Sequence, residues 1–212
     1  MPSARGRPVA AVKKLSSVSL DHGATACTNG AMSERRTMHA DSLRSATDMV
    51  ETRSEADLAR ASRCEGWSVR DLIEHMVGQN YGFAEAIAKG RSGFTAYDPQ
   101  PVGRWGDSAA ALTFAIARPA ESVTLIEISP DTAFPLDSVL AIHTLDLAVH
   151  TWDALGDAFR PSDDIVGLVL AVAGRTTSSA GTSTAFAPPV QSSDSPDQWE
   201  RALNLLGRST SP

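Results

Sequence analysis

The feature that most constrains this chain is the run from Leu136 to Leu155, which is apolar almost all round yet carries His143, Asp146 and His150. On an α-helix, at about 100° per residue, these three side chains fall within roughly 60° of one another and share one face. Apolar residues on the other faces are typical of a helix buried in a bundle. Buried charges must be paired or bound to a metal, because an unsatisfied charge is costly. Asp146 and His150 have the i, i+4 spacing that lets two side chains reach one cation.

Size and charge narrow the class of protein. The 212 residues suit one domain with a tail. Beyond the first 36 residues there are 13 basic and 23 acidic residues, which argues against nucleic acid or an anionic membrane as partner. Cys27 and Cys64 form no C-x-x-C pair, so we expect neither a disulfide scaffold nor a zinc finger, and a reducing cytoplasm fits. No apolar run is long enough for a membrane span or a secretory signal.

The N-terminal segment differs in composition from the rest. Residues 1–37 are rich in Ser, Ala and Gly, with scattered basic residues and no sustained period, which predicts a disordered extension. A targeting or contact tail is one interpretation. We prefer a start codon assigned too early, with Met32 or Met38 as the true beginning. Residues 38–212 then form the bundle and its C-terminal tail.

Helical periods and capping signals predict an all-α fold. Ser68 and Asp71 have the spacing of a capping box at the start of one confident helix. The other expected caps are Asp107 and Ser162, and Pro135 is expected at the first helical position of its helix. Val123 to Ile128 is largely β-branched and predicts a small strand or hairpin. The expected helices are His39 to about Arg53, Val69 to about Ile87, Ser108 to Ala117, the run described above, Asp163 to Arg175, and a short C-terminal helix from about Ser195 that ends at Gly207.

Several other polar residues have a structural and a functional interpretation. His75, in the second turn of the helix that begins at Val69, is the only other histidine inside a predicted core helix. Asp153 could accept a hydrogen bond from a ligand histidine, but we prefer capping or pairing near the helix end. Cys64 precedes a helix, where a thiolate would be stabilised, yet it has no evident base, and we interpret it as a turn residue. We interpret Trp67 and Trp152 as anchors of the core and of a turn. Gln79 and Asn80 are expected on the helix surface, with the mouth of a pocket as the alternative.

Two motifs together resemble a known family. They are Cys64-Glu-Gly-Trp67-Ser-Val-Arg-Asp71-Leu-Ile-Glu-His75-Met-Val-Gly78 and His143-Thr-Leu-Asp146-Leu-Ala-Val-His150-Thr-Trp152-Asp153. They resemble the actinobacterial mycothiol-dependent maleylpyruvate isomerase N-terminal family, within the DinB-like superfamily, over about residues 38–210. The resemblance implies a DinB-like four-helix bundle that holds a divalent metal through His75, Asp146 and His150. The characterised isomerases have glutamate where this chain has Asp146, a shorter arm that an uncharacterised subgroup shares.

The ligand set itself leaves several alternatives open. Two imidazoles and one carboxylate without a fourth protein ligand are typical of a catalytic zinc site with an open position. Nickel, iron or manganese could occupy the same ligands. His143 could close the site as a fourth ligand or could orient a ligand, and we prefer the open site. The simplest alternative is a buried polar cluster in which Asp146 hydrogen-bonds a histidine and no metal is bound.

The motifs suggest three functions. The preferred one is a metal-dependent transferase or isomerase in which the cation activates a thiol, mycothiol by the resemblance, for attack on an electrophilic small molecule. The sequence identifies no acid or base for it. A metal-dependent hydrolase is the second, with His143 as the only nearby group to handle protons. The third is a non-catalytic bundle whose metal stabilises the fold. The substrate, the native metal and the oligomeric state are left open.

Overall fold

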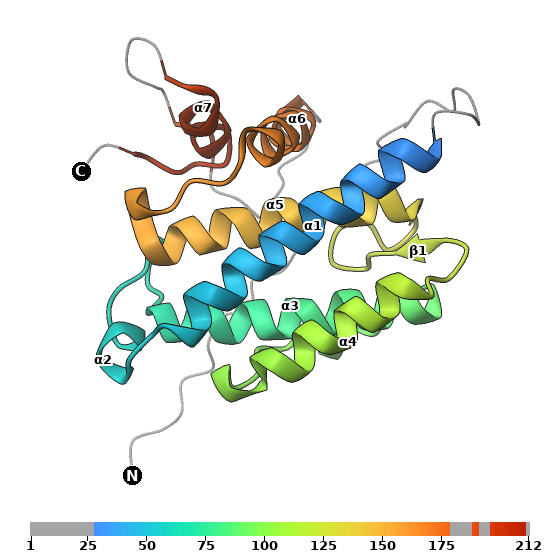
Figure 1. The fold of residues 1–212 in the computed structure, drawn as a ribbon, viewed down its shortest axis with the longest axis horizontal. Helices are drawn as coiled ribbons and strands as arrows, with labels where there is room; N and C mark the ends of the chain where they lie inside the picture. The colour runs from blue at the N-terminus through green and yellow to red at the C-terminus, as the bar shows by residue number, and fades with distance from the viewer. Residues whose placement is uncertain (1–27, 179–187, 191–195, 211–212) are drawn as a thin grey trace.

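Four helices form the main bundle of the protein (Figure 1). The computed structural model describes residues 28–178, 188–190 and 196–210. The bundle helices are α1 (Thr28–Glu51), α3 (Val69–Lys89), α4 (Trp105–Ala117) and α5 (Leu136–Leu155). The prediction of an all-α four-helix bundle is therefore confirmed. None of the described helices combines the length and apolar character that a membrane span requires.

Smaller elements connect and cover the bundle. A two-stranded antiparallel sheet pairs Val123 with Phe134, so the predicted hairpin is present. Helices α6 and α7 pack on the side of α5 (Figure 1). The remaining elements are α2 (Glu55–Leu58), the 3-10 helices η1 (Phe94–Tyr97), η2 (Val102–Arg104) and η3 (Gly156–Ala158), the strands β1 (Val123–Thr124) and β2 (Ala133–Phe134), and the helices α6 (Asp163–Ser178) and α7 (Gln198–Leu205).

The first residues of the helices agree with some of the predicted capping signals and not with others. α3 begins at Val69 behind the predicted capping box of Ser68 and Asp71. In contrast, α4 begins at Trp105, so Asp107 is not its cap; it lies in the first turn, where it pairs with Arg104 at 3.2 Å. Pro135 is the N-cap of α5 rather than its first helical residue.

Helix α1 is longer than the sequence indicates. It begins at Thr28, so residues 28–37, which we assigned to the extension, are helical. The side chain of Arg35 explains part of this, because its Nε donates to Asp137 Oδ1 at 3.2 Å and ties the first turns of α1 to the start of α5. Such a contact between distant segments leaves no periodic signal. The rest of the predicted extension, residues 1–27, lies outside the described residues.

Two hydrophobic clusters meet at α5. One is shared by α1, α3, α4 and the hairpin, and contains Val139 and Leu147 of α5. The other lies among α5, α6 and α7, and contains Leu145, Val149 and Trp152. Because α5 contributes to both, nearly all of its circumference is covered. This explains why its sequence is apolar on every side, and why its polar residues are held in the interior.

Helix α3 lies unusually close to the segment that follows it. A Cβ atom at Gly78 would lie 2.5 Å from the backbone oxygen of Asp98, and one at Gly82 would overlap the ring of Tyr97. Glycine at both positions therefore lets η1 pack directly on the helix backbone. This packing fixes the same face of α3 that carries His75, one turn before Gln79.

Candidate metal centre

The three predicted ligands converge between α3 and α5. His75 from α3 and Asp146 and His150 from α5 each offer one ligand atom, and these atoms all lie within 4.8 Å of one another. His150 Nε2 is 3.3 Å from Asp146 Oδ1, and the rings of His75 and His150 meet edge to face with centroids 5.3 Å apart. Asp146 Oδ2 is buried without a hydrogen-bond partner among the described residues. Two nitrogens, one oxygen and an unpaired carboxylate oxygen fit a divalent cation.

Burial and the neighbouring charges keep His75 neutral and Asp146 ionised, the protonation states in which these side chains bind a metal ion. Burial lowers the pKa of His75 to about 4, and the neighbouring His150 adds to this effect, so His75 is neutral at pH 7. Burial alone would raise the pKa of Asp146, but His150 outweighs it and holds that pKa below its usual range. Against the cost of burial, Asp146 and then Asp153 raise the pKa of His150 well above its ordinary value. A cation at Nε2 would take the place of the proton that this imidazole carries.

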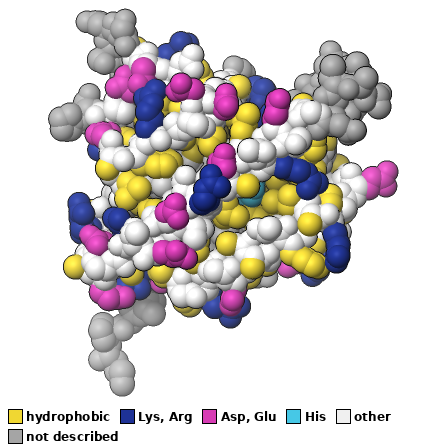
Figure 2. Space-filling view, viewed as in Figure 1, with side chains coloured by type: hydrophobic (Ala, Val, Ile, Leu, Met, Phe, Trp, Pro, Cys, Tyr) yellow, Lys and Arg dark blue, Asp and Glu magenta, His cyan; other side chains and the backbone are white. Residues whose placement is uncertain are grey.

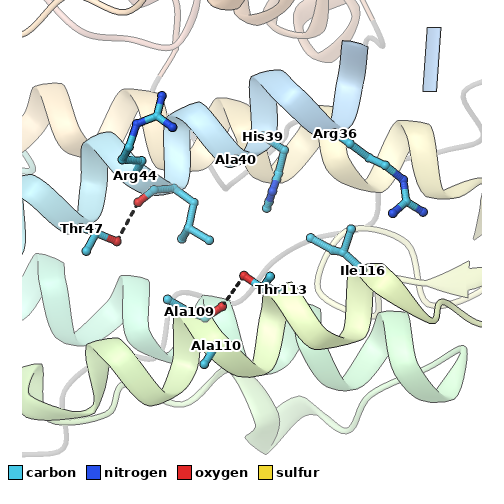
Figure 3. Close-up of a pocket in the computed structure, with 10 residues that line it drawn as sticks. Arg36, His39, Ala40, Arg44, Thr47, Ala109, Ala110, Thr113 and Ile116 are labelled. Carbon is cyan, nitrogen blue, oxygen red and sulfur yellow. Dashed lines mark hydrogen bonds between the residues drawn. The ribbon is translucent and has the colours of Figure 1, made fainter. Parts of the chain in front are cut away.

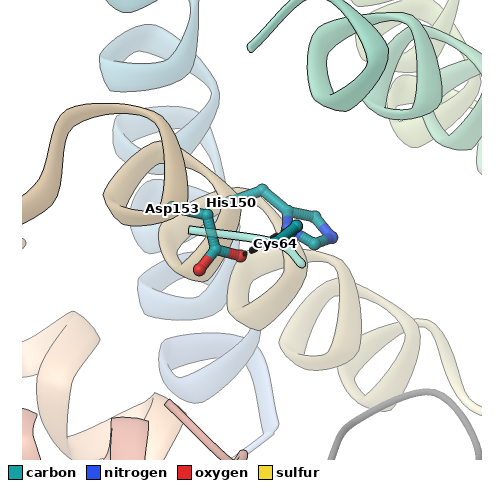
Figure 4. A group of neighbouring side chains, drawn as sticks. All are labelled: Cys64, His150 and Asp153. Carbon is teal, nitrogen blue, oxygen red and sulfur yellow. Dashed lines mark hydrogen bonds and ion pairs between the residues drawn. The ribbon is translucent and has the colours of Figure 1, made fainter. Parts of the chain in front are cut away.

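The second nitrogen of His150 has its own partners, which Figure 4 shows in part. His150 Nδ1 lies 3.0 Å from Asp153 Oδ2, and since a carboxylate can only accept, Nδ1 donates. This leaves Nε2 directed at Asp146, the arrangement in which a carboxylate orients a metal-binding histidine. Arg208 donates to the same Asp153 oxygen at 3.0 Å. The pairing of Asp153 near the helix end was the preferred prediction, and its bond to His150 was the alternative; both are present.

Cys64 also contacts this second group. Its Sγ donates to Asp153 Oδ2 at 3.1 Å and is 4.0 Å from His150 Nδ1. The backbone N–H of Arg63 donates to the Asp153 carbonyl at 2.8 Å and anchors this turn to the end of α5. Cys64, His150 and Asp153 each offer one metal-ligand atom, and these atoms lie within 4.8 Å of one another. The guanidinium of Arg208 already neutralises the shared oxygen, however, so we assign this group the role of supporting His150.

His143 does not join the three converging ligand atoms. Its Nδ1 lies 2.9 Å from Nε2 of His39, a residue of α1 that is only 3% exposed. Its ring packs on Phe83 at 4.4 Å, and its Nε2 is buried without a partner in the described part of the chain. The geometry therefore favours the open site over closure by His143. The bond to His39 engages the histidine that the hydrolase interpretation named as its candidate for proton transfer.

The hairpin brings a further carboxyl group to this region. Gln79 Nε2 donates to Glu127 Oε2 at 3.1 Å, and Gln79 lies one turn after His75 on α3. Burial raises the pKa of Glu127, and the charge of Asp146 adds to the shift. No local pattern in the sequence singles out Glu127, because only the folded hairpin turns it toward α3. Gln79 is buried rather than on the helix surface.

The remaining candidates have structural partners. Asn80 is fully buried, and its Nδ2 donates to Ser108 Oγ at 3.0 Å. Trp152 is buried in the core, as predicted. Trp67 is 36% exposed and meets His75 edge to face, with centroids 5.2 Å apart. It is therefore a wall beside the candidate ligands as well as a turn residue.

Comparisons with known proteins agree with this architecture. The family model described as the mycothiol maleylpyruvate isomerase N-terminal domain matches residues 39–155. A crystal structure of the mycothiol-dependent maleylpyruvate isomerase has a TM-score of 0.52 and 16% identity, covering 67% of this chain and 69% of that one. A histidine-to-alanine mutant of that enzyme gives 0.53 and 15% with the same coverage. No curated protein matches the sequence. At these identities the structures support the shared fold alone.

Proposed function

Because this chain belongs to the mycothiol maleylpyruvate isomerase N-terminal domain family, we propose that it is a metal-dependent transferase or isomerase with mycothiol as cosubstrate. The proposed ligands are His75, Asp146 and His150. The observation that carries the proposal is their convergence from two helices within 4.8 Å, with one Asp146 oxygen that has no hydrogen-bond partner among the described residues. A divalent cation there, zinc by preference, would lower the pKa of a bound thiol and supply a thiolate at neutral pH.

Each of the three side chains would contribute differently to binding such a cation. His75 offers a neutral nitrogen, because burial lowers its pKa to about 4. Asp146 offers an ionised oxygen. Asp153 holds the Nδ1 proton of His150, so that Nε2 is the nitrogen available to the cation. With three protein ligands, a bound cation would have a further position for sulfur. Nickel, iron and manganese are compatible with the same atoms, so zinc is our preference rather than a requirement.

We assign proton transfer in the reaction to Glu127. This carboxyl group is partly buried, bonded by Gln79 and influenced by the charge of Asp146. Burial raises its pKa, and a carboxyl group of raised pKa suits a role in which it donates and recovers a proton. Trp67, against His75, would then form an apolar wall for the substrate. The electrophilic substrate is a small molecule of a class that these residues do not specify.

Elemental analysis tests the ligands directly. We expect purified protein to carry one divalent cation per chain, and His75→Ala and His150→Ala each to lose most of it. His39→Asn is a matched control, because it removes a buried histidine that lies outside the three ligands, and it should retain the metal. Full metal content in both ligand variants would refute the assignment.

A second experiment tests the thiol. Cobalt-substituted protein should change its visible absorption spectrum when mycothiol is added, because sulfur would enter the coordination sphere. The same addition to a His150→Ala variant should give no change. A cobalt spectrum that responds to pH but not to mycothiol would contradict the thiol function and leave the metal site intact.

A further inference from the structure

Helices α1 and α4 enclose a groove of about 410 Å³ (Figure 3). Two threonines line it, but their hydroxyl groups are used by backbone oxygens: Thr47 donates to Leu43 at 2.8 Å and Thr113 to Ala109 at 2.9 Å. Figure 2 shows the opening as a hydrophobic hollow with a histidine in it and basic side chains beside it. The apolar lining consists of Ala40, Leu43, Ala109, Ala110 and Ile116.

One arginine in the groove lining has no charge partner among the described residues. Arg36 extends along the groove toward Ile116 in Figure 3, and it has no ion pair or hydrogen bond with any other described residue. Arg44 differs, because it is paired with Asp41 at 2.6 Å and points away from the groove. No acidic residue lines the groove, although the chain as a whole has a net charge of −6.

A buried imidazole faces the same space. His39 is 3% exposed and projects between the two helices (Figure 3). Its Nε2 is bonded to His143, which fixes the ring, while its Nδ1 has no hydrogen-bond partner in the part of the chain that the structure describes. The groove therefore holds the fixed ring of His39 beside the guanidinium of Arg36, which has no charge partner among the described residues.

We propose that this groove binds a small carboxylate with an apolar body. The carboxylate would pair with Arg36, whose planar guanidinium matches two carboxylate oxygens, and the apolar body would lie over Leu43 and Ile116. Arg36, which has no charge partner in the described part of the chain, would balance one carboxylate charge, whereas a phosphate dianion would keep a charge uncompensated in an apolar setting. The volume is within the range of small-molecule sites. This site is separate from the proposed metal centre and does not depend on it.

Calorimetric titration with octanoate tests this site. We expect one saturable binding event per chain, with and without metal, about tenfold or more weaker in Arg36→Ala because a charged hydrogen bond is lost. Octanol should bind more weakly, and octylammonium should not bind. Ala110→Phe, at an exposed position of the groove, should abolish binding while leaving the helical circular dichroism unchanged. Arg201→Ala, on the exposed side of α7, is the matched control and should bind as the unmodified protein does.

Three outcomes would overturn the proposal. Equal affinity for octanol and octanoate would show an apolar surface without carboxylate recognition. Unchanged binding in Arg36→Ala would place the carboxylate elsewhere. A dimer in sedimentation velocity that Ala110→Phe dissociates would identify a second copy of the chain as the occupant. Because the titration is run without metal as well, none of these outcomes bears on the metal ligands.

Discussion

Replacing His39 by asparagine tests the buried histidine pair that joins α1 to α5. Burial lowers the pKa of His39 to about 3, and the neighbouring His143 adds to the shift. An imidazole in the unfolded chain titrates near its ordinary pKa of about 6.5. Below that pH, His39 is protonated in the unfolded chain but stays neutral in the folded protein. The stability associated with a neutral His39 is therefore complete above pH 6.5 and is lost as pH falls from 6.5 toward 3.

The size of the effect follows from these two pKa values. At pH 5.0 unfolded His39 is almost fully protonated, whereas folded His39 is not. Since one pKa unit corresponds to about 1.4 kcal/mol, the free energy of unfolding falls by about 2 kcal/mol between pH 7.5 and pH 5.0 on account of this residue. Asparagine cannot titrate, so His39→Asn should remove about 2 kcal/mol of pH dependence, whatever its effect on stability at pH 7.5.

Urea unfolding followed by circular dichroism at the two pH values is the appropriate assay. A chelator keeps the proposed metal site empty, so that metal release does not add to the signal. His150, whose pKa is raised, has the opposite pH dependence, but it is present in every variant and cancels in the difference. Ser42→Ala is the control on the same helix, because it removes a buried hydroxyl group that does not titrate and has no hydrogen-bond partner within the described ranges. It should keep the full pH dependence.

If His39→Asn loses as much stability between pH 7.5 and pH 5.0 as the unmodified protein does, then folded His39 titrates normally. That result would mean that water reaches His39, and it would remove the physical basis of the buried pair with His143.

Three further predictions concern the metal centre and the packing of α3. Asp153→Asn should weaken zinc binding by about 10- to 100-fold in a competition assay with a chelating dye, because the amide is a poorer acceptor for His150 Nδ1; unchanged affinity would dismiss the supporting role. Zinc uptake at pH 7 should release about one proton, measured by calorimetry in buffers of different ionisation enthalpy, because the pKa of His150 is well above 6.5 and the cation displaces its proton. Uptake should weaken as pH falls. Gly82→Ala should lower the free energy of unfolding by about 1–3 kcal/mol in urea, because a methyl group there overlaps the Tyr97 ring; an unchanged midpoint would show that this segment yields easily.

Much of the helical fold could be predicted from local sequence signals. The capping box at Ser68 and the apolar period after it were enough to give the start of α3 correctly. The uniform apolar character of α5 correctly indicated a helix covered on all sides. The i, i+4 spacing of Asp146 and His150 needs only helical geometry, so their proximity could be deduced from the sequence. His75 was joined to them through its place in a second core helix and through the family resemblance.

The parts that sequence reasoning missed depend on distant segments. His39 precedes His143 by 104 residues, and nothing local indicates that α1 and α5 bring their rings together. Glu127 reaches Gln79 only because a short hairpin folds back toward α3. The start of α1 was missed for the same reason, since the contact of Arg35 with Asp137 is not periodic. Such contacts are visible only after the helices have packed.

Arg208 connects the C-terminal segment to the buried Asp153 and, through it, to His150. It follows Asp153 by 55 residues, and its guanidinium shares one carboxylate oxygen with the imidazole of His150. Pulling the residues after α7 away from the bundle would withdraw that positive charge and leave the carboxylate to the histidine alone. A partner protein or a modification that displaces the residues after α7 would therefore change the affinity of His150 for a cation.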